Sequence, residues 1–497
     1  MQIPEGAHGP SQLTGPRAWL VLAVTSITVV LIFINASGLN VALSAISRDL
    51  NATGSQSSWF LLSYMLVATA FILVFGRAGD VFGRKSLYIG GIIVFLAGSL
   101  ACGLAPTAES LIAFRFVQGL GAASVITNNT AILTDMFPPR FLSTALGVNA
   151  TAAAAGQALG PVAGGVVVEL LGWRWMFLLA VPLLVIGLMA SVKLIPGSRR
   201  AGRRERMDVS GAVLVVTGLG GLVLAMNGFP GGGGIGNPWV WGPGAGSIVC
   251  LAAFIGLQRR RQSPLIDLGI FDKSTVLLYI SGFLCAFSNY AVVLLASLYL
   301  QAALGRTALE AGLMVVPSPI GTVIAALCCG WLVKRFHYGT LTGIGMLLVA
   351  SGSLGVGLSL GLGWIDYGIP AGLFAVGVGT GLFMTPNTGA LMLRVPSARR
   401  GIANAVRSTL QNAGYLFSTS IALSVATVLL TESDRASAYA GRLLARGGDI
   451  GAFETGVLIA IGVLICAGAG GAAMSFATRR EVAPPFVARE SVYATPR

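Results

Sequence analysis

Hydrophobic residues fall in runs of about twenty along the whole chain, and short polar or basic segments separate them. A helix of this length crosses the hydrocarbon core of a bilayer. We therefore expect an all-α polytopic membrane protein. The runs predict about fourteen membrane-spanning helices, at 18–44, 59–78, 87–105, 110–134, 141–170, 174–195, 209–229, 241–257, 275–303, 308–333, 340–363, 368–393, 401–430 and 453–477.

The order of the runs predicts two similar halves separated by an insertion. Each half carries a short, basic, glycine-led turn after its second span, at 76–85 and at 330–339. Two helical halves around a central site are the usual plan of secondary transporters. The expected segments are an N-terminal tail (1–17), a six-helix bundle (18–197), basic linkers with an inserted two-helix hairpin (198–273), a second six-helix bundle (274–478) and a C-terminal tail (479–497).

Composition excludes a water-soluble protein, because 55% of the 497 residues are hydrophobic and only 10% are charged, against about 25% charged residues in soluble domains. The net charge of +14 reports topology and not nucleic-acid binding. Of the Lys and Arg residues, 24 fall on the side that holds both termini, 6 fall on the opposite side, and Arg115 and Arg407 lie within spans. Basic loops face the cytoplasm, so we expect cytoplasmic termini and a location in the cell membrane.

The sequence has few residues of the types that catalyse reactions or bind metals. His8 and His337 lie outside the spans, and the six cysteines lie in apolar runs without metal-site spacing. The phosphate-binding pattern GxxxxGK[ST] is absent from the sequence. We expect no cofactor, no metal, no ATP-driven motor and no enzymatic activity. A membrane-embedded enzyme or sensor is disfavoured because no paired carboxylates or activated nucleophile face the interior.

Polar residues inside spans mark the candidate substrate cavity, because a charge in a bilayer is costly and by default functional. Arg115 and Asn129 share one helix face, with Gln118 beside them. This face either lines a central cavity or holds an arginine that backbone carbonyls satisfy for purely structural reasons. A second polar face follows in the span at 401–430. The candidates for the cavity wall are Asn35, Arg115, Gln118, Asn129, Asn289, Tyr290, Asn387, Arg407, Gln411 and Tyr415.

Five motifs in chain order resemble those of the major facilitator superfamily, and specifically its fourteen-span drug:proton antiporters. Residues 115–119 resemble the motif RxxQG, residues 173–177 with 181–182 resemble WRWxF…VP, and residues 264–268 read PLIDL. Gly76, Asp80, Gly83, Arg84 and Lys85 resemble the loop motif GxxxDxxGRK, and Gly156, Gly160, Pro161, Gly164 and Gly165 resemble GxxxGPxxGG.

The resemblance implies a monomeric exporter of hydrophobic or amphiphilic small molecules, driven by protons and surrounded by membrane lipids. In such antiporters the loop motif, here with Asp135, latches the cytoplasmic side onto the helix that starts near Gly401. The glycine motif seals the two halves against leakage. The alternatives are an ordinary basic loop for the first motif and ordinary tight packing for the second.

The first span departs from the family, because Asn35 stands where the family has an aspartate. An asparagine cannot carry a proton or neutralise a cation. Glu169 either forms an ion pair with Arg174 at the rim or is a relocated proton site, and Asp135 is the other acid that could serve. The missing acid also leaves open a lipid translocase or an uncoupled facilitator. Without it, we expect neutral or anionic amphiphiles to be preferred over quaternary ammonium compounds.

Overall fold

The computed structural model describes residues 16–196, 208–227, 238–260, 271–333, 335–395 and 400–478, in which all regular structure is helical. Most of the two expected tails, the basic linkers and the motif at 264–268 lie outside the described residues. The chain divides into two compact units. The first comprises Met1–Ile266, Thr307–Leu309 and Tyr439–Gly441, and the second comprises Asp267–Arg306, Glu310–Ala438 and Arg442–Arg497.

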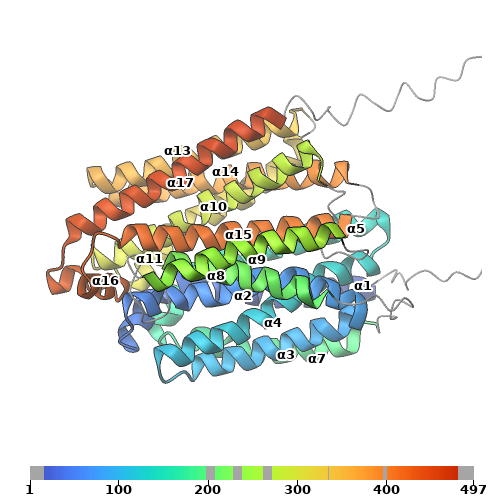
Figure 1. Cartoon of the computed structure of the whole chain (residues 1–497), viewed down its shortest axis with the longest axis horizontal. Coiled ribbons are helices and arrows are strands. Elements are labelled where there is room, and N and C mark those ends of the chain that lie inside the picture. Colours follow the sequence, from blue (N-terminus) through green and yellow to red (C-terminus); the bar gives the residue numbers. More distant parts are fainter. Residues whose placement is uncertain are drawn as a thin grey trace, which may run out of the picture. The chain divides into compact units, whose positions relative to one another are not determined.

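The first unit is built on long helices that pack along one another. α1 packs along α5, and α4 packs along both α2 and α3 (Figure 1). The core lies between α3 and α4, where Tyr88, Phe95 and Val125 are completely buried. The helices of this unit are α1 (Pro16–Asp49), α2 (Gly54–Phe82), α3 (Arg84–Gly103), α4 (Ala108–Met136), α5 (Pro139–Leu170), α6 (Trp175–Leu178), α7 (Ala180–Leu194), α8 (Val209–Asn227) and α9 (Pro238–Arg260).

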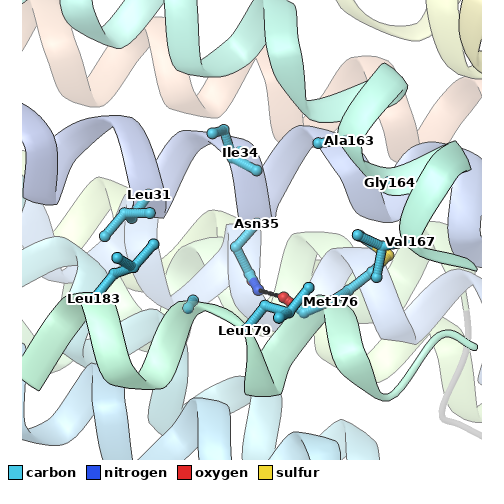
Figure 2. Close-up of a pocket in the computed structure, with 10 residues that line it drawn as sticks. Leu31, Ile34, Asn35, Ala163, Gly164, Val167, Met176, Leu179 and Leu183 are labelled. Carbon is cyan, nitrogen blue, oxygen red and sulfur yellow. Dashed lines mark hydrogen bonds between the residues drawn. The ribbon is translucent and has the colours of Figure 1, made fainter. Parts of the chain in front are cut away.

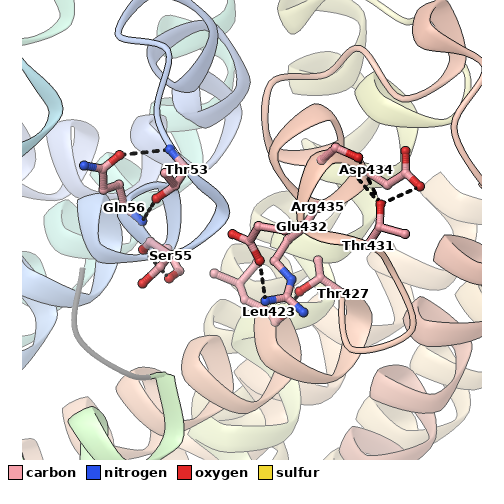
Figure 3. A network of polar contacts seen from close by, with 11 residues as sticks. Thr53, Ser55, Gln56, Leu423, Thr427, Thr431, Glu432, Asp434 and Arg435 are labelled. Atoms are coloured by element: carbon pink, nitrogen blue, oxygen red, sulfur yellow. Dashed lines mark hydrogen bonds and ion pairs between the residues drawn. The ribbon is translucent and has the colours of Figure 1, made fainter. Parts of the chain in front are cut away.

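Local signals in the sequence explain where these helices start. At α2, the Thr53 hydroxyl accepts a hydrogen bond from the Gln56 backbone N–H (3.2 Å), and the Gln56 side chain accepts one from the Thr53 N–H (2.9 Å; Figure 3). This reciprocal capping box satisfies N–H groups that a helix start leaves unpaired. Thr107 and Ser110 do the same for α4. Gly83 separates α2 from α3 with a φ of 99°, a conformation that glycine adopts without strain.

Two expected spans are not continuous helices, and proline explains both breaks. The span at 174–195 divides into α6 and α7 next to Leu179, because Pro182 has no N–H to donate to the carbonyl four residues earlier. In the second unit, the span at 308–333 divides into α11 and α12 because Pro317 occupies the first position of α12. Both segments still count as single candidate membrane spans, Trp175–Leu194 and Ala308–Leu332.

The second unit repeats the plan of long packed helices. α13 packs against α14 and α17, and α10 packs against α15 and α17 (Figure 1). α12 also packs against α14. Thr431 caps the start of the short α16, where its hydroxyl accepts from the Asp434 N–H (3.2 Å; Figure 3). The helices are α10 (Lys273–Ala302), α11 (Ala308–Val315), α12 (Pro317–Leu332), α13 (Tyr338–Leu362), α14 (Ile365–Arg394), α15 (Arg400–Ala426), α16 (Glu432–Tyr439), the 3₁₀ turn η3 (Leu444–Arg446) and α17 (Ile450–Thr478).

Twelve helical segments of the described chain are long and apolar enough to cross a membrane. They include every expected span except two. The apolar part of α8, Val209–Ala225, is shorter than the others, and α15 carries a polar stripe that lowers its hydropathy. The protein is thus a polytopic, all-helical membrane protein, and the count of fourteen spans stays a prediction.

α8 and α9 occupy the segment expected to form an inserted hairpin. They pack against each other, and α8 also contacts α2, while the insertion itself stays a prediction. Val215 and Phe254 form a small core between the two helices. At the start of α8, the buried Asp208 carboxylate accepts hydrogen bonds from the Gly211 N–H (2.8 Å) and from the Gln258 side chain near the end of α9 (2.8 Å). This carboxylate therefore caps one helix and fastens the other to it.

Candidate functional site

A buried polar cluster occupies the interior of the first unit around Arg115. α4 places Arg115 and Gln118 one turn apart, so that the Arg115 guanidinium donates to the Gln118 side-chain oxygen. It also donates to the Phe60 carbonyl (3.1 Å) and lies 4.3 Å from the centre of the Tyr64 ring. Arg115 is only 1% exposed. The sequence left two interpretations of Arg115, a cavity-lining residue and a structural arginine. Its hydrogen bonds to backbone and amide oxygens favour the structural arginine.

Asn35 of α1 connects this cluster to α6. Its side-chain oxygen accepts from Arg115 (3.4 Å) and from Gln118 (3.2 Å), and its NH₂ group donates to the Met176 carbonyl in α6 (3.2 Å; Figure 2). An amide both donates and accepts, whereas an ionised carboxylate only accepts. An aspartate at this position could not make the bond to Met176. Both the oxygen and the NH₂ group of the Asn35 side chain therefore have hydrogen-bond partners.

A cavity of about 190 Å³ opens beside Asn35. It lies among α1, α5, α6 and α7, and Asn35 is the one lining residue with a polar side chain (Figure 2). Leu179 and Leu183 of its lining are exposed, so the cavity opens to the surroundings of the helices, and its apolar wall suits small hydrophobic molecules. The lining residues are Leu31, Ile34, Asn35, Ala163, Gly164, Val167, Met176, Leu179, Ala180 and Leu183.

Asn129 does not belong to the Arg115 cluster, although it lies on the same face of α4. Its side-chain NH₂ donates to Asn149 in α5 (2.8 Å), and its side chain is buried. This face of α4 thus contacts polar side chains at two separate places, one around Arg115 and one at Asn149. The structure brings together Asn35, Arg115 and Gln118 and leaves Asn129 apart.

The glycine motif of α5 packs against α1 inside the same unit. A Cβ at Gly156 would lie 2.7 Å from the Val30 carbonyl oxygen, and one at Gly164 would lie 2.8 Å from the Gly38 carbonyl oxygen. At Gly160 the Cβ would collide with the Ser37 hydroxyl. Pro161 lies inside the same helix, and Gly165 is buried. Small residues here let two backbones touch, and the sealing role stays a prediction.

The turn between α2 and α3 is fastened to two other helices. Arg84 forms an ion pair with Asp135 at the end of α4 (2.5 Å) and donates to the Ala131 carbonyl (3.1 Å). The Lys85 ammonium donates to the Val192 carbonyl at the end of α7 (2.9 Å), where a cation also complements the helix dipole. Gly76 and Asp80 lie in α2, and the side chain of Asp80 lies outside the described residues. The structure therefore places Arg84 beside Asp135, and the latch onto the helix that starts near Gly401 stays a prediction.

The expected ion pair between Glu169 and Arg174 is wrong. Arg174 pairs with Asp49 at the end of α1 (2.5 Å), and the Trp173 indole N–H donates to the same carboxylate (3.0 Å). Glu169 is exposed near the end of α5. The tryptophan and arginine of the motif at 173–177 both reach the one carboxylate, which explains why Glu169 is left out.

In the second unit, the polar stripe of α15 forms a chain of hydrogen bonds. Arg407 donates to Asn404 (3.0 Å) and to Gln411 (2.8 Å), and Gln411 donates to the Tyr415 hydroxyl (2.7 Å). The Tyr415 ring packs on Tyr290 of α10, with ring centres 4.7 Å apart. The spacing of these residues predicted their common face, and the side chains do contact one another.

Two further candidates of this unit lie at different places. Asn387 of α14 lines a small cavity together with Arg407 and Gln411. Asn289 instead contacts the Cys285 sulfur within α10 (3.8 Å). The structure therefore groups Asn387 with the α15 stripe and leaves Asn289 outside it.

Outside the membrane-spanning segments, Asp272 caps the start of α10. It accepts a hydrogen bond from the Thr275 N–H (2.9 Å) and forms an ion pair with Arg394 at the end of α14 (3.5 Å). Hydrogen bonding from Thr275, with a smaller contribution from Arg394, holds the pKa of the Asp272 carboxyl below its ordinary value against the opposing effect of burial. This carboxylate joins two helix ends of the second unit.

A match to a known protein family covers most of this architecture. The family described as Major Facilitator Superfamily matches residues 25–419. The chain belongs to this superfamily. Members of the superfamily are transporters and not enzymes. Within the described residues, no group of three or more His, Cys, Asp or Glu side chains could hold a metal ion.

Relatives and a solved structure agree with the superfamily assignment. The chain is 31% identical to the multidrug resistance protein Stp of Mycobacterium tuberculosis, over 78% of this chain and 72% of that one. It is 27% identical to the tetracenomycin C resistance and export protein of Streptomyces glaucescens, over 84% and 78%. The crystal structure of the POT family transporter PepTSo shares the fold, with a TM-score of 0.68, 13% identity, and coverage of 95% and 100%.

One acid of this transporter was missed from the sequence. Glu454 lies in the first turns of α17, inside the span expected at 453–477, and accepts a hydrogen bond from the Tyr299 hydroxyl of α10 (3.1 Å). Its position at the edge of an apolar run was the available signal. Glu454 therefore joins Glu169 and Asp135 among the acids near spans.

Proposed function

We propose that this transporter exports neutral or anionic hydrophobic small molecules from the cell by alternating access between two six-helix bundles. The apolar cavity beside the neutral Asn35 carries the proposal. A desolvated cation needs a compensating charge nearby. No acidic side chain lines this cavity, so a molecule without positive charge fits it best.

The relatives support export as the direction of transport. One is named a multidrug resistance protein, and another a resistance and export protein for tetracenomycin C. The first name states resistance to drugs, and the second states both resistance to an organic compound and its export. We extend this activity to the present chain as its proposed function, with the substrate restricted by the charge of the cavity.

The topology that we propose has fourteen spans, with both termini in the cytoplasm of a monomer in the cell membrane. It adds α8 and α15 to the twelve long apolar segments. α15 can cross the bilayer if its polar stripe faces protein or water and not lipid. The excess of basic residues on the side of the termini supports the orientation.

Within this scheme, the pair of Arg84 and Asp135 acts in the cytoplasmic gate, and the glycines with Pro161 seal the bundles. Proton coupling would use Glu169 or Asp135, since Asn35 cannot titrate. Asp135 is held by Arg84, whereas Glu169 is exposed and has no ion-pair partner in the described chain. We therefore favour Glu169 as the proton carrier.

The neutral Asn35 also favours a second function on the same fold, which is uncoupled translocation of a lipid or lipid-like metabolite. In inverted vesicles, an exporter coupled to protons loses uptake when the proton gradient is collapsed, while a facilitator keeps it. A matched panel of cationic, neutral and anionic hydrophobic dyes tests the charge preference. Strong transport of dicationic dyes that is lost in Glu169→Gln would contradict the proposal.

A further inference from the structure

The second unit contains a small polar cavity between α10, α14 and α15. Tyr279, Asn387, Arg407 and Gln411 line it together with apolar side chains. Its volume is about 10 Å³, which is about the least that a single water molecule occupies. Such a space takes one oxygen atom of a larger molecule and not the whole molecule.

One side of the cavity lacks a hydrogen-bond donor. Asn387 is 3% exposed, and its NH₂ group donates to the Leu278 carbonyl (3.3 Å). Its side-chain oxygen has no partner in the described part of the chain. Gly282 on α10 leaves the room for this side chain, because a Cβ there would lie 3.3 Å from the Asn387 nitrogen. A buried acceptor without a donor is costly and calls for a ligand or a water.

The Arg407 guanidinium supplies donors to the same cavity. Three of the five N–H groups of an arginine are used here, for Asn404, Gln411 and Ser408 on the same helix. None of the ion pairs within the described residues involves Arg407, and only neutral side chains accept its hydrogen bonds. The cavity is therefore lined both by Arg407, which has unused N–H groups, and by the Asn387 side-chain oxygen, which has no donor.

Among the oxygen groups of organic molecules, a hydroxyl satisfies both sides with a single oxygen atom, as a water molecule also does. A hydroxyl accepts a hydrogen bond from the guanidinium and donates its own hydrogen to the Asn387 oxygen. A carboxylate and an ether have no hydrogen to donate, and an ammonium group is repelled by Arg407. We propose that this cavity is a subsite for the hydroxyl group of a phenol. The phenolic hydroxyl is a strong donor, and the apolar Leu278 and Met384 line the same cavity.

The proposal rests on the proposed function only in that a small hydrophobic molecule reaches the second unit. Binding of 1-naphthol and of 1-methoxynaphthalene to the purified full-length protein tests it, because the two probes differ in the hydroxyl hydrogen. We expect 1-naphthol to bind at least about ten times more tightly. In Asn387→Leu this preference disappears, through weaker binding of 1-naphthol and unchanged binding of the ether.

The matched control is Asn412→Leu, which removes a neighbouring amide of α15 whose NH₂ group bonds the Ser408 carbonyl (2.8 Å) and which does not line the cavity. Both probes should bind to it as to the unchanged protein. Arg407→Met removes the donors from the other side, so it gives the same test if Asn387→Leu does not fold.

Two results would overturn the proposal. Equal binding of the two probes to the unchanged protein means that the cavity holds water only. A preference for 1-naphthol that survives in Asn387→Leu and Arg407→Met means that the hydroxyl binds elsewhere. Failure of export is a separate measurement, made with a hydrophobic dye without hydroxyl groups in vesicles. A failure of export would contradict the proposed function and would not change the binding constants of 1-naphthol and 1-methoxynaphthalene.

Discussion

The two units each hold an arginine inside a helix, and the two arginines are bound in opposite ways. Arg115 contacts the Phe60 carbonyl of α2, Asn35 of α1 and Gln118 of its own helix, and it is almost fully buried. The hydrogen-bond partners of Arg407 all lie on its own helix, and it lines a cavity. The first arginine joins helices together, whereas the second remains available to a ligand.

Replacing each arginine by alanine gives the largest expected effect. Arg115→Ala leaves the Phe60 carbonyl and the Gln118 oxygen without their donor in a buried site, so we expect a loss of about 3 kcal/mol in the free energy of unfolding and no transport. Arg407→Ala should cost less than about 1 kcal/mol, because its partners stay on one helix. Thermal unfolding at matched protein concentration measures both. Equal destabilisation by the two changes would contradict the comparison.

The close contact of α5 with α1 offers the next test of a rigid first unit. Gly160→Ala places a Cβ against the Ser37 hydroxyl and the Gly38 backbone, and we expect overpacking to destabilise the protein by about 2 kcal/mol and to slow transport. Gly147→Ala on the same helix is the control, because a Cβ there meets nothing within 4 Å. If both variants behave like the unchanged protein, α5 and α1 do not pack as described.

The sequence predicted the helices and the polar faces better than the contacts between them. The lengths of the apolar runs predicted the spans, and the helical period of 3.6 residues predicted that Arg407 and Gln411 share one face. Both predictions succeeded because they depend only on neighbouring residues in the sequence. The breaks next to Leu179 and Val316 follow from prolines that were visible but outweighed by hydropathy. The partner of Arg174 could not be predicted, because Asp49 lies 125 residues away in the chain.

Asn35→Asp tests the neutrality of the first unit. The new carboxylate would pair with Arg115 but would lose the bond to the Met176 carbonyl, so we expect a change in stability of about 1 kcal/mol. Because it returns an acid to the cavity, it should improve export of the lipophilic cation tetraphenylphosphonium by about tenfold. Uptake into inverted vesicles measures this. Asn129→Asp, in the same unit but away from the cavity, should leave cation export unchanged, and a gain there as large as in Asn35→Asp would argue against a specific role for Asn35.

The smallest expected effect concerns the helix ends of the second unit that the exposed Asp272 and the half-buried Arg394 hold together. The pKa of Asp272 is lowered, so its contribution to stability is present above its ordinary value of 3.8 and is lost as the pH falls through the folded pKa. Asp272→Asn keeps a good helix cap and removes only the charge that attracts Arg394. We expect a loss of about 0.5 kcal/mol at pH 7, where the pair is intact, and a smaller loss at pH 2.5, where more of the carboxyl is protonated. Melting temperatures of both proteins at the two pH values measure the difference. A pH-independent loss would show that the cap geometry, and not the ion pair with α14, is what Asp272 provides.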